Sequence, residues 1–164
     1  MLRALLLVML GRAILIGEPL PRLDLTAVAD GQAVNLPRAL RSRVVVIDFF
    51  ATWCEPCRDS LPVFERLQKR FADRVDFVSI SEDERREAVA RFVREHRLGG
   101  RVLLDPGRAA FDRLGAHLLP TTYVLDEHAV VRKINHGYGS GFEARMVRWL
   151  EQLTRSPPHP TLPY

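Results

Sequence analysis

Apolar residues along this chain follow two spacings that alternate from one segment to the next. Short apolar runs, or runs with every second residue apolar, predict strands, and apolar residues three or four positions apart predict helices. Strands are expected at 23–27, 32–36, 44–50, 75–80, 102–104, 121–125 and 130–136. Helices are expected at about 54–71, 84–99, 106–115 and 140–154. This alternation predicts an α/β fold with a central sheet flanked by helices.

The turns between these segments indicate how the strands pair. Asp30-Gly31 is a hairpin turn signal between the first two strands, and residues 126–128 form a turn between the last two. The run from Val44 to Phe50 is apolar at almost every position, as expected for a central strand that is covered on both faces. Because the last two strands form a hairpin, the sheet is expected to be mixed.

Three short polar patterns predict helix starts. The S-x-x-E sequences at 81–84 and 140–143 are capping-box patterns. The Asp-Pro pair at 105–106 joins an N-cap residue to a proline at the first helical position. The run at 82–87 interleaves acidic and basic residues, which is typical of a solvated helix face.

The two ends of the chain differ from the domain between them, which is expected to span residues 18–154. Residues 1–17 combine a short basic start with two apolar runs, and they resemble a secretory leader or a membrane signal anchor. Arg12 interrupts this segment, so an ordinary apolar N-terminal segment is the alternative. Residues 155–164 are rich in proline and predict a flexible tail.

Length and charge restrict the class of protein. A chain of 164 residues forms one domain that buries about 70% of its unfolded surface and needs no disulfide for stability. Its only two cysteines are therefore available for chemistry. The net charge is +4, but the sequence contains no basic run of five or more residues and no aromatic residues interleaved with basic ones. Nucleic-acid binding is therefore not expected.

The two cysteines lie in the sequence Trp53-Cys54-Glu55-Pro56-Cys57, between a predicted strand and a predicted helix. A CxxC pair at such a junction is typical of a redox site. Free N–H groups and the macrodipole at a helix N-terminus stabilise a thiolate at the first cysteine. The second cysteine lies one turn further on, so the pair can form a disulfide and transfer two electrons by thiol–disulfide exchange. The redox-active disulfide needs no other cofactor.

Two simpler roles for these cysteines have less support. A structural zinc site needs about four ligands. The histidines show no spacing that would complete one: His96, His117, His128, His136 and His159. A purely structural disulfide across so short a loop would restrict the unfolded chain little.

Taken together, these features resemble the thioredoxin superfamily over residues 20–154. The resemblance rests on Asp48 six residues before the first cysteine, the WCEPC motif, Pro62 in the following helix and the LPTT sequence at 119–122. The N-terminal hairpin and an additional helix–strand unit at about 84–104 resemble the TlpA/ResA-type thiol-disulfide oxidoreductases in particular.

The resemblance implies a thioredoxin-like fold with an N-terminal β-hairpin and a central αβ insertion. Proteins of this type are exported bacterial proteins, often membrane-anchored, that reduce specific disulfides in the cell envelope. The Glu-Pro dipeptide between the cysteines also occurs in the ResA branch, which acts in cytochrome c maturation. The resemblance thus implies protein disulfides as substrates, a membrane-embedded electron donor and a periplasmic or cell-envelope location. Unlike the ResA branch, this chain has Ser60 where a glutamate is usual.

The catalytic residues are expected to be Cys54, Cys57 and Asp48. Cys54 would attack a substrate disulfide as the thiolate, and Cys57 would resolve the mixed disulfide that forms. Asp48 is expected beneath the active-site helix, where desolvation raises the pKa of its carboxyl group toward the range useful for accepting the Cys57 proton. An aspartate that reaches solvent at the end of the strand is the alternative.

The residues expected to bind substrate are Trp53, Glu55, Pro56, Leu119 and Pro120. In the family, the proline at the position of Pro120 is cis and packs beside the disulfide; an ordinary trans loop proline is the alternative. Leu119 could then offer its backbone to an extended substrate peptide. Glu55 places negative charge beside the Cys54 thiolate, which favours the disulfide and a reducing potential, whereas Arg58 and the helix dipole act in the opposite direction, so the sequence leaves the net potential open.

Two rival functions stay open at this stage. A general cytosolic thioredoxin has the same chemistry, but the apolar N-terminal segment and the αβ insertion argue against it. A copper-binding assembly factor on the same fold would use Cys54 and Cys57 as soft Cu(I) ligands and could add His136. Such factors usually have three residues between the cysteines, and this chain has two.

Overall fold

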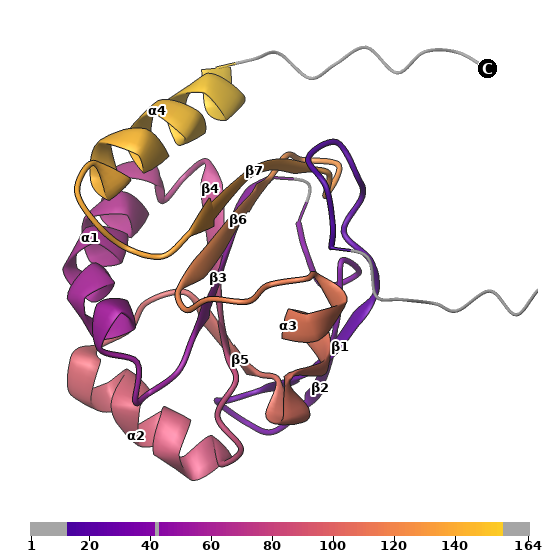
Figure 1. Ribbon diagram of the computed structural model, residues 1–164, viewed down its shortest axis with the longest axis vertical. Coiled ribbons are helices and arrows are strands. Elements are labelled where there is room, and N and C mark those ends of the chain that lie inside the picture. Colours follow the sequence, from indigo (N-terminus) through magenta and orange to yellow (C-terminus); the bar gives the residue numbers. More distant parts are fainter. Residues whose placement is uncertain (1–12, 42, 156–164) are drawn as a thin grey trace, which may run out of the picture.

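The computed structural model describes residues 13–41 and 43–155, and it contains one seven-stranded sheet with helices on both faces (Figure 1). The strands are β1 (Leu23–Ala27), β2 (Ala33–Leu36), β3 (Val44–Phe50), β4 (Val75–Ser81), β5 (Arg101–Leu104), β6 (Thr121–Leu125) and β7 (Val131–His136). The helices are α1 (Glu55–Phe71), α2 (Arg86–His96), α3 (Ala109–Arg113) and α4 (Phe142–Arg155), with a 3-10 turn η1 (Pro106–Arg108) before α3. The predicted order of strands and helices is confirmed.

The sheet is mixed, as predicted, and its strand order is β2-β1-β5-β4-β3-β6-β7. The central strand β3 is parallel to β4 and antiparallel to β6. Hairpins form both edges, β1 with β2 and β6 with β7. β5 pairs with β4 on one side and with β1 on the other. The αβ insertion therefore connects the N-terminal hairpin to the central strands.

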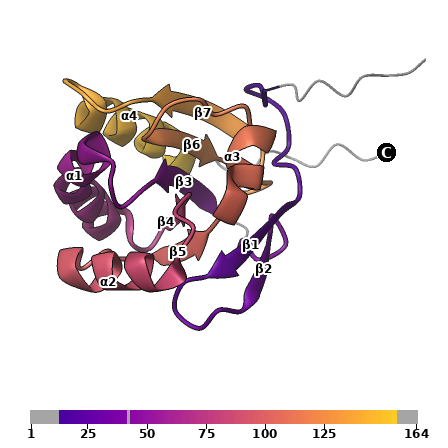
Figure 2. The same ribbon diagram turned by 60° about the horizontal axis from the view of Figure 1, so that its bottom comes forward.

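The side chains of β3 alternate between the two faces of the sheet. Even-numbered residues of Val44–Phe50 face the layer of α1, α2 and α4, and odd-numbered residues face α3. Figure 2 shows these two helical layers on opposite sides of the sheet. All seven residues of β3 are buried, as the apolar run predicted. Asp48 is the one charged residue of this strand, and it faces α1.

The start of α2 differs from the prediction made for residues 82–87. α2 begins only at Arg86, and the residue before it makes no side-chain capping hydrogen bond. Ser81 is still part of β4, where it pairs with Phe50, and its hydroxyl donates to Asp83 at 2.7 Å. Pairing with β3 extends β4 through the predicted cap, because sheet contacts outweigh a local capping pattern.

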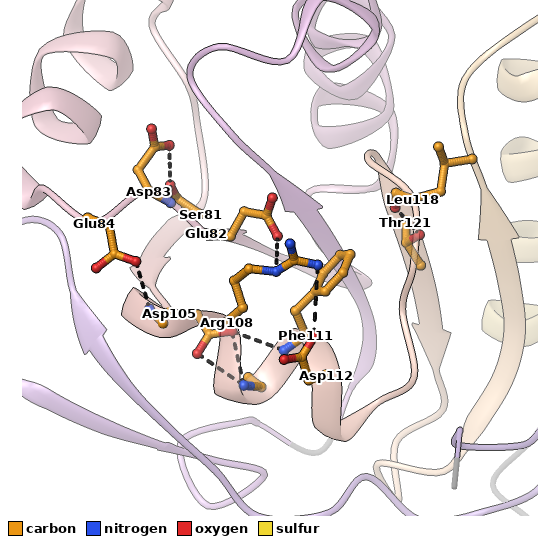
Figure 3. A network of polar contacts seen from close by, with 12 residues as sticks. Ser81, Glu82, Asp83, Glu84, Asp105, Arg108, Phe111, Asp112, Leu118 and Thr121 are labelled. Atoms are coloured by element: carbon orange, nitrogen blue, oxygen red, sulfur yellow. Dashed lines mark hydrogen bonds and ion pairs between the residues drawn. The ribbon is translucent and has the colours of Figure 1, made fainter. Parts of the chain in front are cut away.

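Asp105 caps the helix α3 and not η1, the 3-10 turn that directly follows Asp105 in the sequence. Pro106 opens η1, but the Asp105 carboxylate accepts hydrogen bonds from the N–H groups of Ala110 and Phe111 at 3.0 Å (Figure 3). Asp105 is buried, so these hydrogen bonds compensate the desolvation of its charge. The predicted N-cap residue thus acts one turn later than its sequence position indicates.

The start of α4 is tied to α1 by ion pairs. The Glu143 carboxylate, the acidic residue of the capping-box pattern at 140–143, accepts hydrogen bonds from Arg66 of α1 at 2.8 and 2.6 Å. Further along the two helices, Arg70 contacts Glu151 at 2.6 Å. These pairs hold α4 against the helix that begins at the cysteines.

The predicted leader and tail fall mostly on residues 1–12 and 156–164, which lie outside the described residues. The segment just after residue 12 packs on the domain: Ile14 is buried, and its N–H donates to the Leu114 carbonyl at 3.2 Å. The boundary expected at residue 18 stays a prediction. Among residues 13–41 and 43–155, no helix has both the length and the apolar character needed to cross a membrane.

Candidate active site

The two cysteines lie where β3 ends and α1 begins. Cys54 is the N-cap residue of α1, and Cys57 lies in the first turn. Their sulfur atoms form a disulfide, with the Cα atoms 5.3 Å apart. The N–H of Cys57 donates to Sγ of Cys54 at 3.2 Å. The same donor would stabilise a thiolate at Cys54 after reduction.

The two cysteines differ from each other in exposure. Cys54 is 5% exposed and borders a surface groove, whereas Cys57 is 1% exposed and lies in the core with Phe50 and Phe92. A substrate sulfur in the groove can therefore reach Cys54, while Cys57 is covered.

The loop before the cysteines is held by the end of β4. Thr52 donates to the Asp83 carboxylate through its N–H at 2.9 Å and its hydroxyl at 2.7 Å. Glu82, which lies between β4 and Asp83, donates its N–H to the Phe50 carbonyl at 3.1 Å. Asp83 thus fixes the position of the segment that leads into Cys54.

Asp48 is buried on β3, so the alternative of a carboxylate that reaches solvent is excluded. The Thr122 hydroxyl donates to its Oδ1 at 2.7 Å. Burial raises the pKa of Asp48 to about 7, and the hydrogen bond from Thr122 acts weakly in the opposite direction. The carboxyl group can therefore take up and release a proton near neutral pH.

A cavity of about 190 Å³ lies beside Asp48, between the sheet and α1. Phe50 and Ser79 border it from the strands, and the exposed His96 borders it from the end of α2. A cavity of this size has room for water. It offers a route by which the Asp48 proton can exchange with solvent.

The active-site groove beside Cys54 has a volume of about 380 Å³. The residues that line it come from the CxxC segment (Trp53, Cys54, Glu55, Pro56), from the loop before β6 (His117, Leu118, Leu119) and from the region of β4 and α3 (Glu82, Arg108, Phe111). Trp53 is 67% exposed at its edge. Apolar side chains of Trp53, Leu118 and Leu119 form part of its walls, against which an extended peptide could pack.

The structure brings together most, but not all, of the predicted substrate-binding residues. Trp53, Glu55, Pro56 and Leu119 all line the groove. Pro120 is buried, follows a cis peptide bond as the family resemblance implied, and is not part of the lining. The Leu36–Pro37 peptide is also cis, a feature that no sequence pattern indicated.

Glu82 and Arg108 are groove residues that sequence reasoning missed (Figure 3). The prediction that Glu82 lies on a solvated helix face is wrong, because it follows β4 directly and its side chain is only 5% exposed. Burial raises the pKa of Glu82, and the nearby charge of Arg108 acts in the opposite direction. A usable signal was its position: the carboxyl ends of parallel strands are where α/β proteins place their sites.

Two histidines form a pair beside the groove. The rings of His117 and His136 lie 4.8 Å apart between centroids, and His136 Nδ1 is 3.3 Å from the Thr121 hydroxyl. Desolvation and the neighbouring His117 lower the pKa of the His136 ring, although the residue as a whole is exposed. Within the part of the chain that the structure describes, no three metal-binding side chains are grouped to hold an ion.

Comparisons with known proteins agree with this geometry. The chain matches the sequence profile of the redoxin family over residues 15–147. It is 32% identical over 124 residues to the thioredoxin-like protein YneN of Bacillus subtilis (strain 168), covering 74% of this chain and 71% of that protein. It is 28% identical over 127 residues to the thiol-disulfide oxidoreductase ResA of Halalkalibacterium halodurans, and the match covers 77% of this chain and 70% of that protein.

Two solved structures from Chlorobium tepidum have a similar fold. A thiol:disulfide interchange protein of the thioredoxin family from Chlorobium tepidum superposes with a TM-score of 0.69 at 26% identity, covering 87% of this chain and 99% of that one. A candidate DsbE protein from the same organism has a TM-score of 0.79 at 22% identity, with coverage of 87% and 99%. The second likeness concerns the fold.

Proposed function

We propose that this chain, which belongs to the redoxin family and is a TlpA/ResA-like thiol-disulfide oxidoreductase, reduces disulfides of other proteins in the cell envelope. The observation that carries the proposal is the disulfide at the N-terminus of α1, with Cys54 bordering a groove and Cys57 buried behind it. This arrangement exposes one sulfur to a substrate and keeps the second for an internal reaction.

The proposed reaction has two exchange steps. In the reduced protein, the Cys54 thiolate attacks one sulfur of a substrate disulfide, and the other substrate sulfur leaves and takes up a proton. Cys57 then loses a proton, which we assign to Asp48, and attacks Sγ of Cys54. The second substrate sulfur leaves, and the Cys54–Cys57 disulfide forms. Two electrons have passed to the substrate, and an external dithiol donor must return them.

The groove residues supply the remaining roles in this proposal. Trp53, Glu55 and Pro56 would contact the substrate on one side, and Leu119 would pair its backbone with an extended peptide on the other. Pro120 would hold the Leu119 segment in place. Glu55 lies in the first turn of α1, where its charge opposes that of a thiolate.

The direction of electron flow can be tested by redox titration. Because Glu55 disfavours the Cys54 thiolate and therefore the reduced state, we expect a reducing potential of about −200 to −300 mV against a glutathione buffer. A value near that of a strong oxidant, about −120 mV, would contradict the reductase assignment. Exchange of Glu55 for Gln should move the potential toward more oxidising values.

The location in the cell envelope is part of the proposal and needs its own test. The similarity to a thiol-disulfide oxidoreductase of the ResA type supports it, and a role in cytochrome c maturation with a membrane-embedded donor is the specific form that the resemblance to the ResA branch implies. The predicted leader, residues 1–17, overlaps the folded domain at Ile14, which packs in the core. A reporter fused after residue 17 should be active outside the cytoplasm; a reporter that stays inside both with this start and with any upstream start would exclude the envelope assignment.

A further inference from the structure

Glu82 presents a buried carboxylate to the active-site groove. Its side chain is 5% exposed, and among the described residues its Oε2 accepts no hydrogen bond. The nearest cation, Nε of Arg108, lies 3.3 Å from Oε2, close enough for an ion pair but outside hydrogen-bonding geometry (Figure 3). A buried carboxylate oxygen without a donor is unfavourable, so the site favours any group that can donate to it.

Arg108 covers Glu82 through weak contacts. Its side chain is 50% exposed, and the backbone adopts the left-handed conformation with φ of 60°. The guanidinium lies over the Phe111 ring at 4.7 Å, and its terminal nitrogen is 3.8 Å from the Asp112 carboxylate. Arg108 is half exposed, but it pairs with a buried carboxylate, so it can move away only where another cation takes its place beside Glu82. A second cation entering the groove could therefore reach Glu82 by displacing Arg108 or by joining it.

The charge of the groove favours a basic side chain of the substrate. Glu55 and Glu82 carry negative charge on its lining, against the single positive charge of Arg108. We propose that Glu82 is a specificity-determining residue that receives a lysine or arginine side chain next to the substrate cysteine attacked by Cys54. This inference rests on the proposed reduction of protein disulfides, and it names the substrate class that the groove prefers. Glu82 itself does not take part in sulfur exchange.

The test uses three disulfide-linked peptides that differ only beside the cysteine, with lysine, norleucine or glutamate at that position. Stopped-flow measurement of their reduction by the fully reduced protein gives one rate constant for each peptide. We expect lysine to exceed norleucine by roughly tenfold, the effect of one charge-assisted hydrogen bond, and glutamate to be slowest. The readout is the ratio of the lysine rate to the norleucine rate.

Two variants should move this ratio in opposite directions. Glu82→Gln keeps the size of the side chain but removes its charge, so the ratio should fall to within about twofold of unity. Arg108→Gln removes the competing cation, so the ratio should rise. Asp73→Asn is the control for loss of one acidic charge, since Asp73 is exposed just after the C-terminal end of α1 and is not part of the groove lining, and it should leave the ratio unchanged.

The outcomes separate this inference from the function on which it rests. If the wild type reduces all three peptides equally, or if Glu82→Gln keeps the ratio, Glu82 does not determine specificity. If the wild type instead reduces the glutamate peptide fastest and Arg108→Gln removes that preference, the groove binds acidic residues through Arg108 and the inference is wrong. If none of the three peptides is reduced, the proposed function itself fails.

Discussion

Cys54→Ser is expected to lower the rate of disulfide reduction by roughly 10³-fold or more, the scale for loss of a catalytic nucleophile. A serine hydroxyl at this position cannot form a disulfide with substrate, and it is hardly ionised near neutral pH. Insulin reduction with a dithiol donor measures the loss. Ser60→Ala is a suitable control, because Ser60 lies in α1 one turn after Cys57 and its hydroxyl donates to the Cys57 carbonyl at 2.7 Å.

Cys57→Ser should fail at a different step. Cys54 can still attack substrate, but nothing resolves the product, so a covalent complex should accumulate on non-reducing gels. The same asymmetry should appear with iodoacetamide, which we expect to modify Cys54 quickly and Cys57 slowly, since Cys57 is 1% exposed. Trapped complexes in Cys54→Ser but not in Cys57→Ser would reverse the assignment of the two cysteines.

Much of this site could be predicted because its signals are local. The apolar run of β3, the CxxC pair and the helix that follows are adjacent in sequence, and together they place Cys54 at a helix N-terminus. Burial of Asp48 also follows from local pattern, because a strand covered on both faces buries each of its side chains.

The remainder of the site depends on contacts between distant segments. Glu82 lies directly after β4, which continues through Ser81, and Arg108 is the last residue of η1. The two side chains come into contact only because β4 and η1 lie side by side in the fold. A local reading of the charged run at 82–87 favours a helix face instead. The place of β5 between β4 and β1 is likewise a matter of tertiary pairing. Local patterns predicted each of these elements but not which side chains they bring together.

Asp48→Asn should have the largest effect of any substitution that leaves both cysteines in place. Asp48 and Phe50 lie on the same face of β3, and Phe50 packs in one cluster with Cys57. The carboxylate is therefore on the side of the sheet where Cys57 must lose its proton. Ser60 stands where the resemblance to the ResA branch implies a glutamate, so among the described residues we expect Asp48 to be the acid that acts on this face.

The stability effect of Asp48→Asn depends on pH in a defined direction. The pKa of Asp48 is raised to about 7 in the folded protein, above the value near 3.9 in an unfolded chain. The folded state holds the Asp48 proton more tightly than the unfolded state does. The free energy of unfolding therefore falls as pH rises from about 4 to 7, and the full loss applies above pH 7. Asparagine cannot ionise, so it avoids this loss, and its side-chain oxygen can still accept the Thr122 hydrogen bond. Urea unfolding of the oxidised variant should show a gain of about 2–4 kcal/mol at pH 8 and a much smaller gain at pH 5.

The same substitution should slow release of substrate from the mixed disulfide. At neutral pH the wild-type carboxylate can accept the Cys57 proton, whereas the amide cannot, so we expect resolution to slow by roughly 100-fold, within the range for loss of a general base. The wild-type rate should rise through pH 7, and the variant should lack that inflection. Stopped-flow reduction of a model disulfide across pH measures both effects. Asp59→Asn removes an exposed acid from α1, the helix that contains Cys57, and should leave the profile unchanged. If Asp48→Asn matches the wild type at every pH while Asp59→Asn does not, the proton goes to Asp59 and Asp48 has only a structural role.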